Sequence, residues 1–126
     1  FLKKLPGIIV VDHMGRPDVS KGVDHPDFVR FINLMVENEN IWTKVTCPER
    51  LTQAGAPYDD VVPYYQAIVD RFEDRVLWGT DWPHPNMKSH MPDDGALVDY
   101  IPRIARTEAQ QQKLLVSNPM RLYWGV

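Results

Sequence analysis

The segment Leu77-Trp78-Gly79-Thr80-Asp81-Trp82-Pro83-His84-Pro85-Asn86 carries the clearest signal for the fold of this 126-residue chain. An apolar run that ends at Thr80 is followed at once by a carboxylate, a histidine and an amide, in a turn stiffened by two prolines. This order is typical of a buried strand whose C-terminal end presents a catalytic carboxylate. The alternative is a capped turn with a solvated Asp81, and the segment alone leaves both interpretations open.

The composition is that of an ordinary globular domain, with 44% hydrophobic and 25% charged residues. The net charge of -3 gives no support for nucleic-acid binding, and the longest apolar run, Ile8 to Val11, is too short to cross a membrane. Cys47 is the single cysteine, which excludes an internal disulfide and favours a reducing compartment, so we expect a cytoplasmic protein. The chain lacks an initiating Met and opens on a loop before a strand, and we expect it to be part of a longer protein.

Strands and helices are predicted to alternate along the chain. Three short runs rich in β-branched residues predict strands over Gly7–Asp12, Ile41–Thr46 and Arg75–Thr80. Apolar residues at helical spacing predict helices over Pro26–Asn38 with Asp24 as N-cap, over Asp59–Glu73, and over Gly95–Ala105 with a break around Pro102. A capping-box pattern at Thr107–Gln110 predicts a last helix that runs to about Val116.

The alternation of strands and helices requires parallel strands joined by right-handed crossovers. Two folds satisfy it, and the lengths of the loops favour one of them. The two folds are an open three-stranded sheet and three units of a (β/α)8 TIM barrel. The segments after the strands are long and polar, namely Asp12–Asp24, Cys47–Tyr58 and Asp81–Gly95, whereas the returns after the helices are short. Long loops on one face and tight turns on the other are typical of a barrel. We therefore predict an α/β fold that forms the closing part of a barrel, the rest of which lies before Phe1.

A histidine follows the first predicted strand. The near-neutral pKa of His13 suits proton transfer or a contact with an oxyanion at the open end of a barrel. The alternative is a histidine that orders its loop by bonding Asp12 or Asp18. Those two carboxylates also lie close enough in sequence to pair with Arg16, which we expect to be structural.

An arginine follows the second predicted strand. The planar guanidinium of Arg50 suits a substrate carboxylate or phosphate, because it binds two oxygens at once. The alternative is an ion pair with Glu49 or Asp59 at the rim, and the spacing leaves both open. Cys47 is expected to pack at the strand end, since no neighbouring base in the sequence would make it a nucleophile.

The third strand is followed by three candidate groups. A carboxylate at the edge of a site can take a proton from water, so Asp81 is the candidate general base. With His13 and His84 it also offers ligand types that suit a divalent ion, although the chain contains no His-x-His pair. His84 is expected to orient the loop. Asn86 can donate to a substrate carboxylate or cap a turn, and both remain open.

Four separated motifs agree with one known family in order and spacing. They are Trp78-Gly79-Thr80-Asp81-Trp82-Pro83-His84, Asn118-Pro119-Met120-Arg121-Leu122-Tyr123, Val11-Asp12-His13-Met14-Gly15-Arg16-Pro17-Asp18 and Thr46-Cys47-Pro48-Glu49-Arg50-Leu51. Together they resemble the C-terminal part of the amidohydrolase superfamily, in its amidohydrolase 2 branch. Within that branch they are most similar to lactone hydrolases of bacterial lignin and aromatic breakdown. The resemblance covers essentially the whole chain.

The resemblance implies a distorted (β/α)8 barrel of which residues 1–126 supply strands six, seven and eight. It implies that Asp81 is the general base, that His13 contacts the reacting lactone, and that Arg50 and Asn86 hold the carboxylates of a small dicarboxylate substrate. It also implies that no metal or other cofactor is needed, which is unusual in that superfamily. The His-x-His pair of strand one and the arginines and tyrosine of strands four and five have no counterpart here, so we expect this chain alone to be inactive.

Two other functions stay open. One is a metal-dependent decarboxylase or hydrolase of the same superfamily that acts on another carboxylate, with Asp81 as a zinc ligand. The other is a non-catalytic structural piece. We expect the amino-terminal remainder of the barrel as a partner, and the oligomeric state does not follow from the sequence.

Overall fold

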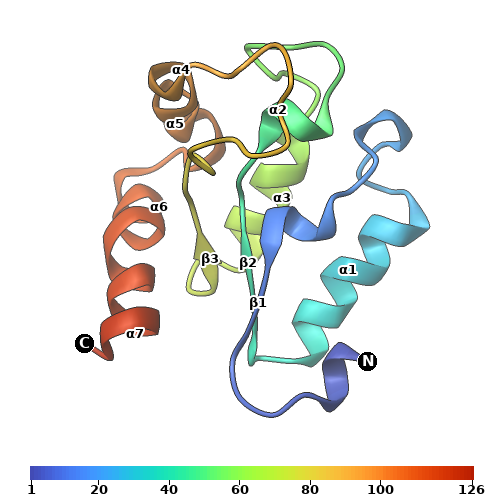
Figure 1. Ribbon diagram of the computed structural model, residues 1–126. Coiled ribbons are helices and arrows are strands. Elements are labelled where there is room, and N and C mark those ends of the chain that lie inside the picture. Colours follow the sequence, from blue (N-terminus) through green and yellow to red (C-terminus); the bar gives the residue numbers. More distant parts are fainter.

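A parallel sheet of three strands lies at the centre of the computed structural model, which describes residues 1–126 (Figure 1). β1 (Ile9–Val11), β2 (Ile41–Lys44) and β3 (Val76–Leu77) lie in the order β1-β2-β3, so that β2 is central and the other two are edge strands. Ile9 pairs with Ile41, and Thr43 pairs with Val76. The predicted parallel arrangement is confirmed. The strands are shorter than predicted because the chain leaves the ladder before each polar loop.

The three strands differ in burial, and the edge strand β3 is buried like the central one, with Val76 and Leu77 at most 4% exposed. In the central strand β2, Ile41 and Thr43 are fully buried, whereas every residue of the edge strand β1 is only half-buried. The core lies between the sheet and the helices, and its members include Met35, Ile41, Val45, Tyr65, Ile68, Val76, Leu97 and Ile104. The continuous apolar run at β1 predicts a strand buried on both faces, and that prediction is wrong for β1 in this structure.

Helix α1 (Pro26–Glu37) matches its predicted boundaries within one residue, but its N-cap is His25 and not Asp24. The Nδ1 atom of His25 accepts a hydrogen bond from the backbone N–H of Asp27 at 3.3 Å. Any side chain that places an acceptor over the free N–H groups of the first turn can serve as a cap. The Asp24 prediction was wrong for this reason.

The middle helices are shorter than predicted. α3 (Val62–Arg71) begins three residues late, because residues 59–61 form turns. The predicted helix over Gly95–Ala105 is two helices, α4 (Asp94–Asp99) and α5 (Ile101–Ile104). Their junction is Tyr100, which places Pro102 in the first turn of α5, where a missing N–H is tolerated. A single-turn helix, α2 (Pro48–Leu51), follows β2 without having been predicted.

The last helix begins as predicted and ends later. The capping box at Thr107 and Gln110 is present and opens α6 (Glu108–Gln112). The predicted end near Val116 is wrong, because a π-helical turn, η4 (Lys113–Ser117), leads directly into α7 (Asn118–Trp124). A π turn is a common way to insert a residue such as Pro119 that cannot donate to the helix ladder.

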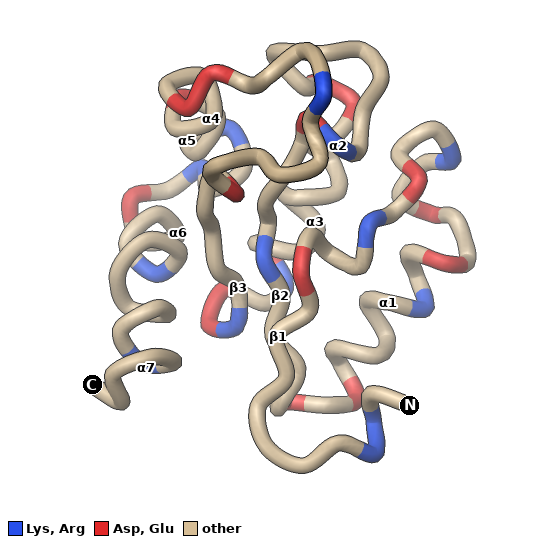
Figure 2. The backbone as a smooth tube through the Cα atoms, in the orientation of Figure 1, with Lys and Arg blue, Asp and Glu red and all other residues tan.

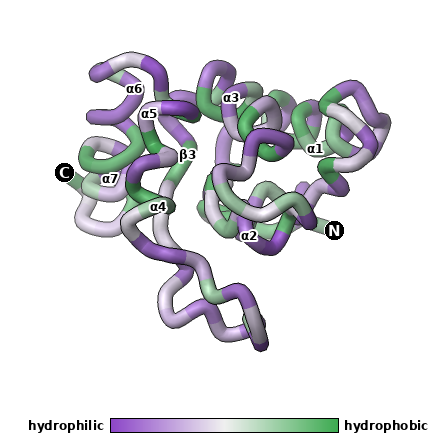
Figure 3. Tube along the Cα trace, turned by 90° about the horizontal axis from the view of Figure 1, so that it is seen from above, coloured by the Kyte–Doolittle hydropathy of each residue, from purple (hydrophilic) through white to green (hydrophobic).

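The surface is mixed in charge and in polarity. Basic and acidic residues are interspersed over the helices and loops (Figure 2). The loop that leads into α4 projects from the body of the molecule and is hydrophilic over most of its length (Figure 3). None of the helices combines the length and the apolar character that crossing a membrane requires.

Candidate active site

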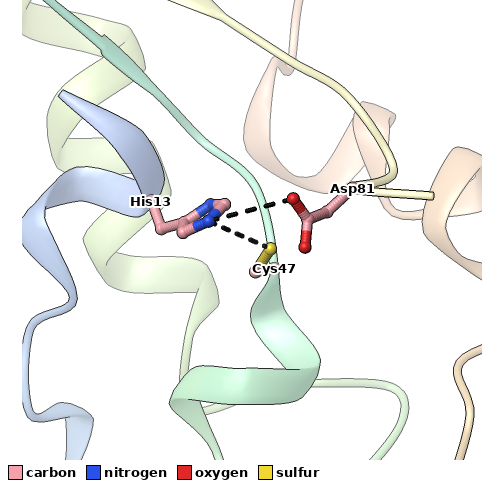
Figure 4. A group of neighbouring side chains, drawn as sticks. All are labelled: His13, Cys47 and Asp81. Atoms are coloured by element: carbon pink, nitrogen blue, oxygen red, sulfur yellow. Dashed lines mark hydrogen bonds and ion pairs between the residues drawn. The ribbon is translucent and has the colours of Figure 1, made fainter. Parts of the chain in front are cut away.

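The C-terminal ends of the three strands bring His13, Cys47 and Asp81 together, with their side chains pointing toward one another (Figure 4). His13 lies in the short 3-10 helix η2 (Asp12–Gly15) directly after β1, Cys47 precedes α2, and Asp81 follows β3. One donor atom from each side chain lies within 4.8 Å of the others. Neighbouring parallel strands end at the same edge of a sheet, so residues distant in sequence meet there.

The backbone at these three positions is left-handed. The φ angle is 52° at His13, 60° at Cys47 and 62° at Asp81. Residues other than glycine rarely adopt this region, and those that do are concentrated at active sites. Each strand therefore turns sharply at the residue whose side chain enters the cluster.

Both ring nitrogens of His13 have neighbours in the site. Its Nδ1 lies 2.5 Å from the hydroxyl of Thr46, while Nε2 lies 3.7 Å from the Cys47 sulfur and 3.9 Å from Oδ1 of Asp81. Burial lowers the pKa of His13, which favours the neutral imidazole. The alternative partners Asp12 and Asp18 do not bond to it, so His13 serves the cluster rather than its own loop.

Arg50 faces Asp81. Its Nη2 donates to Oδ2 of Asp81 at 2.5 Å, and its side chain is 10% exposed. The alternative rim pairs with Glu49 and Asp59 are not formed, since Asp59 bonds to Arg103. The Nε of Arg50 is buried without a hydrogen-bond partner and remains available as a donor.

Two residues considered above lie apart from this group. Asn86 is exposed and makes no hydrogen bond to His13, Arg50 or Asp81. Arg16 is also exposed and does not pair with Asp12 or Asp18, contrary to expectation. The Asp12 carboxylate bonds instead to Lys44, at 2.7 Å, and this contact lowers the pKa of Asp12.

A small cavity of about 210 Å³ opens beside the cluster. Its walls include His13, Asp81 and the Asp12–Lys44 pair, together with Thr46. Charged and hydrogen-bonding groups of both signs thus face one space, as a polar substrate requires. The larger hollows of the surface lie elsewhere, beside the N-terminal segment and under the loop into α4.

Sequence reasoning missed three contributors to the site. Cys47 was expected only to pack, yet its buried sulfur contacts His13, and burial raises the pKa of its thiol so that it stays protonated. Thr46 was given no role, and Glu49 was considered only as an ion-pair partner of Arg50. The positions of Thr46 and Cys47 directly after the second strand were the available signal, because neighbouring strand ends meet.

His84 orients the loop, as predicted. Its backbone N–H donates to the carbonyl of Asp81 at 2.8 Å, and its buried imidazole lies 3.2 Å from Oδ1 of Asp94. The other ring nitrogen lies 3.8 Å from Oε1 of Glu49. Burial raises the pKa of Glu49, since the carboxylate has lost its water without gaining a hydrogen bond.

The three side chains are of the types that bind a divalent metal, but a neighbouring positive charge opposes the metal. A neutral imidazole, a thiol and a carboxylate are ordinary zinc ligands. However, Oδ2 of Asp81 already accepts from the guanidinium of Arg50, and a fixed cation in contact with one ligand opposes a dication at the same place. His13, Cys47 and Asp81 could hold a metal only if Arg50 moved away.

A family model described as amidohydrolase matches residues 1–124 of the chain. The chain belongs to the amidohydrolase family. The resemblance found in its motifs is thereby confirmed, and the three-stranded parallel sheet is part of a TIM barrel of that family.

Two curated relatives of this amidohydrolase chain are named as hydrolases. It is 60% identical to a 2-pyrone-4,6-dicarboxylate hydrolase from Comamonas testosteroni, over 98% of this chain and 43% of the relative. It is 41% identical to a 4-sulfomuconolactone hydrolase from Hydrogenophaga intermedia, over 93% of this chain and 39% of the relative. The chain thus spans about two fifths of the length of these curated relatives.

A solved structure has the same fold. A protein from Acinetobacter baumannii, provisionally named a 2-pyrone-4,6-dicarboxylic acid hydrolase and crystallised with citric acid bound, superposes with a TM-score of 0.81 at 27% identity. The match covers 98% of this chain and 46% of that protein. The arrangement of strands and helices described above is therefore that of one part of a larger enzyme of this family.

Proposed function

We propose that this chain supplies strands six, seven and eight of a (β/α)8 barrel that hydrolyses 2-pyrone-4,6-dicarboxylate to open-chain 4-oxalomesaconate. The observation that carries the proposal is the convergence of His13, Arg50 and Asp81 at the ends of three parallel strands. The 60% identity to a 2-pyrone-4,6-dicarboxylate hydrolase supports this pyrone as the substrate. In this proposal residues 1–126 are one part of a single domain, completed by an amino-terminal part that pairs with the free edges of β1 and β3.

The first step is the addition of water to the lactone carbonyl. Oδ1 of Asp81 takes a proton from the water, while Oδ2 stays bonded to Arg50. The water oxygen forms a bond to the carbonyl carbon, and the carbonyl oxygen becomes an oxyanion. Nε2 of His13 lies on the same side as Oδ1 and donates to that oxyanion, which requires that the Thr46 hydroxyl donates to Nδ1.

The second step opens the ring. The bond between the carbonyl carbon and the ring oxygen breaks, and the ring oxygen receives the proton held by Asp81. A guanidinium N–H of Arg50 that Asp81 does not occupy binds one carboxylate of the substrate. Asn86 lies in the exposed loop after β3 and binds the second carboxylate once this loop closes over the substrate.

The enzyme is proposed to work without a metal or other cofactor, because Arg50 supplies the positive charge next to Asp81. A metal-dependent hydrolase of the same family is the second candidate, and the proximity of His13, Cys47 and Asp81 favours it. A bound zinc would polarise the carbonyl and acidify water. We place the enzyme in the cytoplasm, since its one cysteine is free and buried.

The test uses the complete protein that carries this chain. Purified protein should consume 2-pyrone-4,6-dicarboxylate, followed by the loss of pyrone absorbance, and should keep its rate after dialysis against a chelator. A rate that disappears with the chelator and returns with zinc would favour the second candidate. No turnover of the pyrone under either condition would contradict the proposed reaction.

A further inference from the structure

A buried polar pair lies behind the active site, and the reaction proposed above does not use it. The side chains of Glu49 and His84 are 3% and 4% exposed. Neither oxygen of Glu49 has a hydrogen-bond partner, and the Nδ1 of His84 has none either. A buried carboxylate without donors costs free energy of folding. A pair that opposes stability in this way is typical of a functional region rather than of a core.

The pair joins the segments that carry Arg50 and Asp81. Glu49 precedes Arg50 within the single turn of α2. His84 closes the turn after Asp81, because its N–H donates to the Asp81 carbonyl at 2.8 Å. The Oε1 of Glu49 lies 3.8 Å from the Nδ1 of His84, so the two segments meet at this contact as well as in the site itself.

Apart from the ion pair with Arg50, the loop that follows Asp81 has few buried contacts. His84 is the single buried residue between Asp81 and Asp93. Its second contact, to Asp94, reaches a carboxylate whose side chain is 48% exposed. The contact with Glu49 is therefore the buried support of the loop on the side that faces Arg50.

We propose that Glu49 and His84 are positioning residues, whose buried contact sets the place of the Asp81 carboxylate relative to the Arg50 guanidinium. The catalytic consequence rests on the proposed function. A displacement of about 1 Å in a catalytic group can cost as much as ~10²-fold in rate. Because His84 is the one buried residue of the loop after Asp81 and contacts Glu49, a change at Glu49 would shift the turn that carries Asp81.

Three variants of the complete protein test the inference. Glu49→Met removes the charge and keeps the length of the side chain, and Glu49→Gln keeps the shape and the polar atoms. Asp59→Asn is the matched control, because Asp59 is an exposed carboxylate of the same loop that pairs with Arg103 outside the site. For each variant we would measure kcat, KM, the melting temperature, and the hydrogen exchange of the backbone from Asp81 to Met87.

Glu49→Met should lower kcat at least about tenfold and change KM less than about threefold, since the base is displaced while the substrate contacts remain. Its melting temperature should stay level or rise, because an unpaired buried carboxylate has been removed. Exchange from Asp81 to Met87 should become faster. Glu49→Gln should recover most of kcat, and Asp59→Asn should match the parent in every measurement.

A kcat of Glu49→Met within twofold of the parent, with unchanged exchange, would overturn the inference. So would a lower melting temperature with unchanged kcat, since that result describes a purely structural residue. If the parent does not hydrolyse the pyrone, the proposed function fails, and the exchange comparison alone then decides whether Glu49 holds the Asp81 turn.

Discussion

At the residue scale, the Asp81 carboxylate has two oxygens with different neighbours. Oδ2 bonds to Arg50, while Oδ1 faces Nε2 of His13 at 3.9 Å. In the complete protein, Asp81→Asn should lower kcat by ~10²–10⁴-fold, the usual contribution of a positioned base, and leave KM nearly unchanged. Steady-state kinetics with the pyrone would measure both. Turnover close to that of the parent would remove Asp81 from the role of base.

The protonation of His13 should set the pH below which activity is lost. Burial lowers its pKa below the 6.5 of a free histidine, so the folded protein binds a proton at this site less readily than the unfolded chain does. The contribution of His13 to stability is therefore complete above pH 6.5 and is lost as the pH falls toward the lower folded pKa. The rate should be constant just above pH 6.5 and fall only well below it.

A melting series from pH 7.5 to pH 4.5, on the complete protein and on His13→Gln, would measure this contribution. The loss of stability on acidification should be smaller in the variant, because glutamine has no proton to gain in this range. Equal slopes for the two proteins would show that the burial of His13 is not linked to folding.

At the scale of elements, the sequence predicts which strands exist and which side chains their ends present. His13 and Asp81 follow β1 and β3, the strands on either side of β2, and they meet because parallel strands end at one edge of the sheet. The predicted alternation of strands and helices is enough to foresee this. The Arg50–Asp81 contact could not be foretold. The contact depends on the left-handed backbone of Cys47 and on the single turn of α2. Both are too short to leave a periodic pattern in the sequence. Local spacing instead suggested Glu49 or Asp59 as the partner of Arg50.

The C-terminal helix shows a second limit of the sequence pattern. The sequence analysis predicts an end near Val116, yet the helix continues through a π turn into α7, because tertiary contacts outweigh the hydrogen-bond donor that Pro119 lacks. Asn118 supplies two of these contacts. Its buried Nδ2 donates to the carbonyls of Glu73 and Val76, at 2.7 and 2.9 Å, and so fixes α7 against β3.

Replacing Asn118 should test this junction between helix and sheet. Asn118→Asp removes both donors and buries a carboxylate beside two carbonyl oxygens, so the complete protein should lose about 3 kcal/mol or more of unfolding free energy. Asn118→Ala should lose about 1–3 kcal/mol. Urea denaturation measures both values. A loss below about 0.5 kcal/mol for Asn118→Asp would contradict the buried double hydrogen bond.

At the scale of the whole molecule, the sheet has two unpaired edges. β1 and β3 each have a neighbour on one side only, and all three residues of β1 are half-exposed. Trp82 and Trp124 are 75% and 67% exposed. Free strand edges and exposed aromatic residues favour association between chains. In the barrel proposed here, the amino-terminal strands would cover both edges.

The 126-residue chain expressed by itself should therefore form oligomers or aggregates and should not hydrolyse the pyrone. Size-exclusion chromatography with light scattering and a thermal melt would show this. Co-expression with the amino-terminal part of a relative should reduce the association. A sharp melt of a monomer by itself would show that the sheet is complete and that the barrel proposal is wrong.

The left-handed backbone at His13, Cys47 and Asp81 has a consequence for how such an enzyme diversifies. Each of these side chains is oriented by its own backbone, two to four residues after its strand ends and before the tip of the following loop. Loop tips such as residues 53–56 and 87–92 can then be exchanged between relatives without re-aiming the chemistry. Grafting those tips from the sulfomuconolactone hydrolases would change the substrate specificity and leave the catalytic residues in place.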